Sequence, residues 1–460
     1  MNVVLISGYE LGRQPFGLAS PAAWLKQTGV SVTSVDLAVQ HLPKEVIASA
    51  DLVAFYVPMH TATRIAVRAL EPVKAINPRT HLCFYGLYAP ANEGFLRKLG
   101  VHTILGGEYE QGLVTLVQRL LQSGQQNHDG SQQEPVISMG RLRFLTPDRT
   151  GLPALSKYAY LNLGTGGHRT VGYTEASRGC KHLCRHCPIV PIYQGKFRII
   201  QREVVLEDIK RQVAVGARHI TFGDPDFFNG PRHAVAIVEG LHREFPDLTY
   251  DVTIKVEHLL KHSDLLPTLR DTGCLFVTSA VESFDERVLE ILEKHHTAED
   301  CRQTVSLFRE VGLTFVPTFV TFTPWTTAAA YREFLGTILR LNIVENIAPI
   351  QYAIRLLIPA NSRLLELDEV RQLVGDFDEP SLCYPWSNPD PTVDRLYADV
   401  LEVVKNAHSK HRSRWEIFVE VWKLANEICE SDALTSLRVL GSVDIPPRER
   451  IPFLSEPWFC

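Results

Sequence analysis

The sequence has no long hydrophobic run. Its longest apolar stretches, such as "CLFVTSAV", have the length of a strand. A membrane-spanning helix needs about 18 to 20 apolar residues, so we expect no membrane partner. The opening "MNVVLISGYELG" has neither a basic segment nor a small-residue cleavage site, and we expect a strand there instead of a signal peptide.

An excess of positive charge is also missing. The 47 Lys and Arg residues face 52 Asp and Glu residues, which gives a net charge of -5. The chain therefore lacks the basic field with which proteins grip nucleic acid. Its 45% hydrophobic and 22% charged residues are typical of a soluble globular protein. A chain of 460 residues is too long for one core and predicts two or three domains.

A disulfide framework is not indicated either. There are nine cysteines, an odd number, and all but one group of them are scattered along the chain. We therefore expect a reduced, cytoplasmic compartment. Cys383, Cys429 and Cys460 lack the spacing of metal ligands and predict no second cluster.

Residues 1–122 alternate short apolar strands with helical stretches. The strand candidates are "NVVLISG", "VSVTSVDL", "DLVAFYV", "HLCFYG" and "HTILGG". This alternation predicts an α/β fold whose first domain is a Rossmann-like parallel sheet covered on both faces. Residues 123–168 begin with the polar "SGQQNHDGSQQEPV" and are expected to be a linker followed by an irregular wrapping segment.

A second series of strands and helices extends over residues 169–365. Its strand candidates include "HITFGD", "LTYDVTIK", "CLFVTSAVE", "LTFVPTFVTF" and "IQYAIRLLI". Each candidate meets a polar residue near its end, namely Asp224, Lys255, Glu282, Thr321 and Arg355. Such ends line one rim of a parallel barrel, so the pattern predicts a partial TIM-like barrel with a binding rim.

Two local patterns and the last segment complete the expected architecture. Ser283 with Glu286, and Thr297 with Asp300, have capping-box spacing and predict helix starts. Residues 366–460 are expected to form a small, mostly helical region with a tail.

Three cysteines crowd one short loop of the predicted barrel. Cys180, Cys184 and Cys187 in "SRGCKHLCRHC" have the spacing C-x3-C-x2-C, and soft thiolates select zinc, copper(I) or iron–sulfur clusters. His182 or His186 could complete a structural Cys3His zinc site. A [4Fe–4S] cluster held by three cysteines would instead keep one iron open. The position after the first barrel strand favours the open cluster, because ligands bind at that rim.

The cysteine loop resembles that of the radical SAM superfamily. The resemblance implies that Cys180, Cys184 and Cys187 hold a [4Fe–4S] cluster whose open iron binds S-adenosylmethionine (SAM). One electron then cleaves SAM to methionine and a 5'-deoxyadenosyl radical. Matching segments such as "FGDPDFF", "SAVES" and "IRLLIPANSRLLE" imply that SAM is contacted by Gly223, Asp224, Asp226, Lys255, Ser279, Glu282 and Arg355.

The first domain resembles the cobalamin-binding domain that precedes many radical SAM cores. The resemblance implies that Gly86, Gly106 and Gly107 let the backbone approach a bulky cofactor tail. The Asp-x-His-x-x-Gly motif, which supplies a histidine to cobalt, is absent. Cobalt would then have no protein histidine; an empty, structural domain is the alternative.

The tail is similar to that of the CUAEP/CCAEP-tail radical SAM group. Phe453, Leu454 and Ser455 replace the Cys, Cys and Ala of that motif, whereas Glu456 and Pro457 remain. The thiol pair is therefore missing, and any function of the pair is in doubt.

These resemblances imply a radical SAM enzyme that acts on a small molecule and receives electrons from a donor such as flavodoxin or ferredoxin. With cobalamin bound, methyl transfer to an unactivated carbon is the expected reaction. Without cobalamin, transfer of the 3-amino-3-carboxypropyl group of SAM or other radical chemistry remains open. A non-catalytic iron–sulfur or zinc scaffold is the alternative from a different class.

Overall fold

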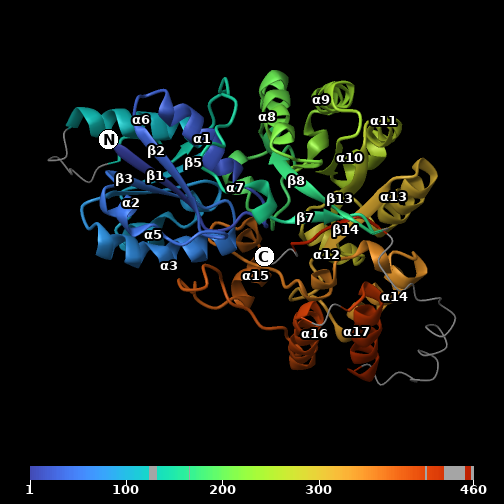
Figure 1. Cartoon of the computed structure of the whole chain (residues 1–460). Helices are drawn as coiled ribbons and strands as arrows, with labels where there is room; N and C mark the ends of the chain where they lie inside the picture. Colours follow the sequence, from blue (N-terminus) through green and yellow to red (C-terminus); the bar gives the residue numbers. More distant parts are fainter. Residues whose placement is uncertain (124–131, 165, 410–411, 429–450, 457–460) are drawn as a thin grey trace.

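The computed structural model describes residues 1–123, 132–164, 166–409, 412–428 and 451–456. Two large β-sheets organise these residues and lie side by side, each with its own helices (Figure 1). Most of the polar stretch expected as a linker, together with Cys429 and Cys460, lies outside the described residues. The expected domain boundaries stay a prediction.

The front sheet is parallel throughout and has the order β2-β1-β3-β4-β5-β6. Its strands are β1 (Asn2–Ser7), β2 (Ser31–Asp36), β3 (Leu52–Tyr56), β4 (His81–Tyr85), β5 (Thr103–Gly107) and β6 (Ile137–Ser138). The first five coincide with the predicted strands. β3, β4 and β5 are buried along their whole length, because helices cover both faces of the sheet.

The helices of this half form two layers around the sheet (Figure 1). One apolar layer includes residues of α1 (Phe16–Lys26) and α6 (Tyr109–Ser123). The opposite layer includes residues of α2 (Lys44–Ala48), α3 (His60–Ile76), α4 (Tyr88–Ala91) and α5 (Glu93–Lys98). The predicted Rossmann-like domain is thereby confirmed.

The second sheet has the order β14-β13-β12-β11-β8-β7-β15. Its five parallel strands are β8 (His168–Thr174), β11 (His219–Phe222), β12 (Thr249–Thr253), β13 (Cys274–Glu282) and β14 (Thr314–Phe319). The antiparallel strands β7 (Tyr160–Asn162) and β15 (Phe453–Leu454) extend one edge.

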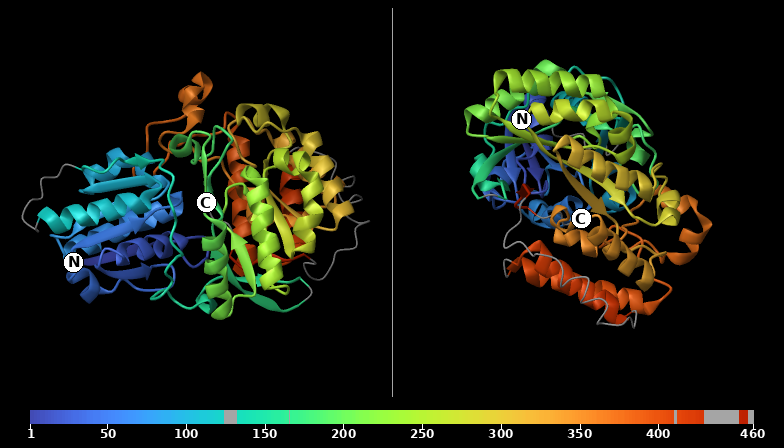
Figure 2. Two further views of the ribbon diagram at one scale, coloured as in Figure 1. Left: turned by 90° about the horizontal axis from the view of Figure 1, so that it is seen from above. Right: turned by 90° about the vertical axis from the view of Figure 1, so that its right-hand side faces the viewer.

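Helices follow the parallel strands and pack around this sheet (Figure 2). They are α8 (Arg202–Ala214), α9 (Pro231–Glu244), α10 (Val256–Lys261), α11 (Leu266–Asp271), α12 (Glu286–Ile291), α13 (Ala298–Val311) and α14 (Ala328–Arg340). The sheet with its helices forms the predicted partial barrel.

The structure corrects two local predictions. The segment "IQYAIRLLI" forms a 3-10 helix over Pro349–Ala353 instead of a strand, and only the bridge from Phe322 to Arg355 continues the parallel pairing. The amide of Gln351 explains this, because its Oε1 accepts the Phe319 N–H at 2.7 Å and replaces a strand partner. The helix expected to be capped by Ser283 is capped instead by Asp285. The capping box of Thr297 and Asp300 is confirmed.

The last part of the chain contains α15 (Asp368–Leu373), α16 (Pro391–Ser409) and α17 (Arg414–Ile428). Residues 451–456 then return to the junction of the two halves (Figure 2). There β15 pairs with β7, and Glu456 Oε1 accepts a 2.7 Å hydrogen bond from Tyr9 of the front domain. Among the described helices, none is both long enough and apolar enough to span a bilayer.

Candidate active site

A cavity of about 550 Å³ lies between the two sheets, and the carboxyl ends of strands from both halves line it. From the front domain come residues after β1, β3, β4 and β5, and from the barrel come residues at the ends of β8, β11, β12, β13 and β14. Ligands bind at such ends in open α/β sheets and in barrels alike. The chain therefore brings two binding rims face to face.

The cysteine loop leaves the barrel at this rim, after β8 and β9 (Ser177–Gly179). Cys180, Cys184 and Cys187 are free thiols. Burial raises the pKa of Cys180 to about 11 and that of Cys187 to about 12. Without a cation both thiols therefore stay protonated near neutral pH, and bound iron would draw the protons off. Three soft donors within one loop of eight residues suit an iron–sulfur cluster.

The backbone of the loop is fastened to the barrel. Lys181 N–H donates to Asn229 Oδ1 at 3.1 Å, and Arg185 N–H donates to the carbonyl of Leu292 at 3.0 Å. The short α7 (Val190–Tyr193) follows, and β10 (Phe197–Ile199) pairs with β9 to close the loop. The loop is thus held at its base and near its middle.

Asp224 supports the strand that leads into the loop. Its carboxylate accepts hydrogen bonds from Ala176 N–H at 2.9 Å and from Ser177 Oγ at 2.6 Å. Burial raises the pKa of Asp224 to about 7. Gly223 beside it must be glycine, because a Cβ there would lie 1.9 Å from the hydroxyl of Tyr173. Both Gly223 and Asp224 line the cavity.

Glu282 joins the loop to the far side of the rim and lines the cavity. Its Oε1 lies 3.0 Å from Nε2 of His186 and 3.3 Å from Nζ of Lys294. Lys294 and His186 lower the pKa of this buried carboxyl to about 2. Because a lowered pKa stabilises the fold above the ordinary value of 4.5, this contribution is lost as the pH falls from about 4.5 to about 2.

We expect Glu282→Gln to lower the free energy of unfolding of the cluster-free protein by about 3 kcal/mol at pH 7, since a shift of one pKa unit corresponds to about 1.4 kcal/mol. Below about pH 4.5 the difference from the wild type should shrink, because Glu282 of the unfolded wild-type chain then takes up a proton, whereas in the folded protein it stays charged down to about pH 2. Denaturant unfolding at pH 7 and pH 3.5 measures this. The exposed Glu290→Gln serves as control. A difference that is equal at both pH values would contradict the assignment.

Asp226, Lys255 and Ser279 do not line the cavity. Asp226 Oδ2 lies 2.6 Å from Nδ1 of His258 and 3.4 Å from Nε2 of His182, and these imidazoles lower its pKa. Lys255 Nζ lies 3.1 Å from Nδ1 of His182. The side chain of Ser279 is buried. Their assignment to SAM stays a prediction.

The neighbourhood of His182 keeps the zinc alternative open. Ligand atoms of Cys180, His182 and Asp226 all lie within 4.8 Å of one another. This group of possible metal donors shares only Cys180 with the three-cysteine set. A metal bound there would therefore compete with a cluster.

The three front-domain glycines have packing neighbours. A Cβ on Gly106 would lie 2.3 Å from Pro90 Cγ, one on Gly107 would lie 2.1 Å from the Ser138 carbonyl oxygen, and one on Gly86 would meet Tyr56 at 3.1 Å. Only Gly107 lines the cavity. These contacts account for glycine at the three positions, and their role towards a cofactor stays a prediction.

Arg355 lines the cavity but is held by the C-terminal region. Its guanidinium donates to Asp394 Oδ1 and to the Trp386 carbonyl, both at 2.7 Å, and lies 3.7 Å from the centre of the Trp386 ring. These contacts fix its orientation at the rim.

The sequence did not predict an ion-pair network around Arg178, which lies two residues before Cys180. Arg178 donates to both carboxylate oxygens of Glu110, at 2.7 and 2.9 Å, and to Glu175 at 2.7 Å. Glu108 lies 3.6 Å away. Glu108 and Glu110 follow β5, so this buried arginine joins the front domain to the cysteine loop. The acidic pair in "LGGEYE" was visible in the sequence, but its partner 68 positions away was not.

Residues 174–330 match the family model described as the radical SAM superfamily. Ribosomal protein uS12 methylthiotransferase RimO of Syntrophotalea carbinolica is 26% identical over 173 residues, 36% of this chain and 38% of that protein. Hopanoid C-3 methylase of Methylococcus capsulatus is 23% identical over 151 residues, 33% of this chain and 29% of that protein. The chain thus matches less than half the length of either relative.

Two solved structures share most of the fold. The cobalamin-dependent SAM radical enzyme OxsB with aqua-cobalamin bound superposes with a TM-score of 0.68 at 16% identity, over 89% of this chain and 68% of that chain. The radical SAM methyltransferase TsrM from Kitasatospora setae, with cobalamin and a [4Fe–4S] cluster, gives 0.58 at 16% identity over 74% and 73%. The likeness includes the Rossmann-like front domain and the partial barrel.

The family match spans the cysteine loop and the strands β11 to β14 that form the rim around it. This family implies a [4Fe–4S] cluster and SAM. The sequence-based prediction of a radical SAM domain is therefore confirmed, and in this chain that domain lies behind a Rossmann-like front domain.

Proposed function

We propose that the enzyme cleaves SAM reductively at a [4Fe–4S] cluster held by Cys180, Cys184 and Cys187, and that it uses cobalamin to transfer a methyl group to a small molecule. The cavity shared by two rims carries this proposal. The cysteine loop opens on one side of it and the front domain on the other, so two cofactors could meet one substrate there.

The residues of the chain would bind and orient the cofactors and the substrate, and they would exclude water from the cavity. When bound, the cluster supplies the electron that cleaves SAM, and cobalamin supplies a carrier for the methyl group. Asp224 and Arg178 hold the strand before the cysteine loop, and Glu282 holds His186 within it. Aromatic and aliphatic side chains such as Tyr56, Phe222 and Phe319 line the cavity and would keep water from a radical.

The front half of the cavity suits a cobalt without a protein histidine. Among the described residues that line it, the front domain contributes no histidine. His60 is near, but its Nε2 lies 2.6 Å from the Ser381 carbonyl and is engaged there. We infer that the enzyme acts on a small-molecule substrate in the cytoplasm and receives its electrons from a reductant such as flavodoxin or ferredoxin.

An anaerobic assay with SAM labelled separately in its methyl and aminocarboxypropyl groups tests the proposal. We expect a brown protein with about four irons per chain that forms 5'-deoxyadenosine with dithionite. It should also pass the methyl label to added hydroxocobalamin once dithionite has reduced the cobalt from Co(III) to Co(I). Movement of the aminocarboxypropyl label would establish the alternative transfer. A colourless protein with one zinc would overturn the enzyme proposal in favour of a scaffold.

A further inference from the structure

The turn after β1, residues 8–14, carries two polar side chains that each leave one buried atom without a hydrogen-bond partner among the described residues. The side chain of Glu10 is 5% exposed, and its Oε2 accepts no hydrogen bond. The Nε of Arg13 also lacks a partner, while its guanidinium lies 5.0 Å from the centre of the Tyr173 ring. Both residues line the cavity. Buried polar groups are nearly always paired in natural proteins, so two such groups in one turn indicate a ligand.

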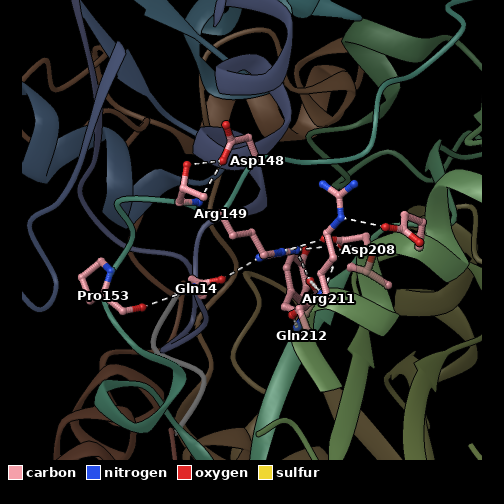
Figure 3. Close-up of polar contacts among 11 residues, drawn as sticks. Gln14, Asp148, Arg149, Pro153, Asp208, Arg211 and Gln212 are labelled. Atoms are coloured by element: carbon pink, nitrogen blue, oxygen red, sulfur yellow. Dashed lines mark hydrogen bonds and ion pairs between the residues drawn. The ribbon is translucent and has the colours of Figure 1, made fainter. Parts of the chain in front are cut away.

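The wrapping segment holds this turn from the barrel side (Figure 3). Gln14 donates to the Pro153 carbonyl at 2.9 Å and accepts from Arg149 Nη1 at 2.9 Å. Arg149 in turn donates to both carboxylate oxygens of Asp208 on α8, at 2.8 and 2.9 Å. The position of the turn is therefore set by the barrel as well as by the front sheet.

The tail holds the turn from another side. Tyr9 donates to Glu456, and the carbonyl of Gly12 accepts from Ala159 N–H at 2.8 Å. Leu11 and Gly12 both have left-handed backbones, with φ of 51° and 68°. A leucine in this region is strained and persists only where its surroundings enforce it. The turn is thus rigid, and its two unpaired groups are presented in a fixed position.

The turn also lies where the front sheet would bind a ligand. β2 and β3 pair with opposite sides of β1, so the loops after β1 and β3 diverge and open a crevice. Burial raises the pKa of Glu10 well above its usual range, which favours the uncharged carboxyl. An uncharged carboxyl both donates and accepts a hydrogen bond, which matches a primary carboxamide. Arg13 can donate to a carboxamide oxygen.

We propose that Glu10 and Arg13 bind peripheral carboxamide groups of a corrinoid in the cavity. This inference rests on the proposed use of cobalamin and names the residues by which the front domain recognises it. Corrinoids carry primary carboxamides around the ring, and two neutral groups that each donate and accept can pair without burying a net charge.

The test compares corrinoid binding by visible absorbance in the wild type, Glu10→Leu, Glu10→Gln and Arg13→Met. The probes are hydroxocobalamin and the heptamethyl ester of cobyrinic acid, whose esters accept but do not donate hydrogen bonds. We expect Glu10→Leu and Arg13→Met each to weaken hydroxocobalamin binding about tenfold or more, because a buried partner is left unpaired. Glu10→Gln should bind nearly as the wild type does, since an amide also donates and accepts. The ester should lose less affinity on Glu10→Leu than hydroxocobalamin does, because it can accept a hydrogen bond from the Glu10 carboxyl but cannot donate one to it.

Glu45→Leu, the same substitution at an exposed position of α2, is the matched control, and thermal midpoints verify that each variant is folded. Equal hydroxocobalamin affinity in the wild type and Glu10→Leu would overturn the inference and leave cobalamin use intact. A wild type that cleaves SAM but binds no corrinoid would overturn both the inference and the cobalamin part of the proposed function. Loss of binding in Glu10→Gln equal to that in Glu10→Leu would overturn the neutral pairing.

Discussion

Cys184→Ala is expected to abolish both iron binding and SAM cleavage. Of the three cysteines in the loop, Cys184 is the most buried, and its carbonyl accepts the Cys187 N–H at 3.2 Å. Removing this thiol leaves two donors in the loop, which is too few to hold a cluster that needs three thiolates and one SAM-bound iron. The variant should be colourless after anaerobic reconstitution, and 5'-deoxyadenosine formation should fall to background.

Cys301→Ala is the matched control for this experiment. Cys301 is a fully buried, free cysteine on α13 and belongs to the core rather than to the cysteine loop. Its loss should cost some stability but keep the brown colour and the SAM cleavage. Retention of four irons per chain in Cys184→Ala would refute the ligand assignment.

Arg178→Met is expected to be the most destabilising substitution at the junction of the two halves. It leaves Glu108, Glu110 and Glu175 buried without the cation that pairs with them. Removing one partner of a buried ion pair typically costs about 3 to 5 kcal/mol. Urea unfolding followed by far-UV circular dichroism should show a loss of this size, and the iron content should fall because the strand before Cys180 loses its anchor.

Arg211→Met provides the comparison for this substitution. Arg211 is half exposed on α8 and, within the part of the chain that the structure describes, pairs with Glu207 alone, one turn away, an arrangement worth about 0.5 kcal/mol. If Arg178→Met proves too unstable to purify, Glu110→Gln removes one carboxylate charge and keeps its shape. Equal stability of Arg178→Met and Arg211→Met would show that the buried network does not hold the halves together.

The strands could be predicted because their signal is local. A buried parallel strand such as β3 is apolar along its whole length, and the polar residue that follows marks its carboxyl end. The same rule placed Asp224 and Glu282 at the rim. The rule failed for "IQYAIRLLI". There the side-chain amide of Gln351, within the segment itself, accepts the Phe319 N–H in place of a strand backbone.

The sequence could not show that the two rims of the cavity face each other, since this depends on how the two domains meet. Glu10 and Arg13 follow β1 as plainly as Asp224 follows β11, yet the sequence does not show that the ring of Tyr173 in the barrel lies against Arg13. The role of Arg178 likewise depends on residues 68 positions away in the other domain. Contacts between side chains of two different domains leave no periodic pattern in the sequence, so they cannot be predicted from it.

The hydrogen bond from Tyr9 to Glu456 joins residues that lie 447 positions apart in the chain. This separation has a consequence for folding during biosynthesis. The front sheet can form while the ribosome is still making the barrel, because domains generally fold in the order of their synthesis. Its first turn, however, gains its last support only when residues 453–456 have emerged. A nascent chain would therefore hold an incomplete crevice, and capture of a large organic prosthetic group would wait until residues 453–456 have left the ribosome.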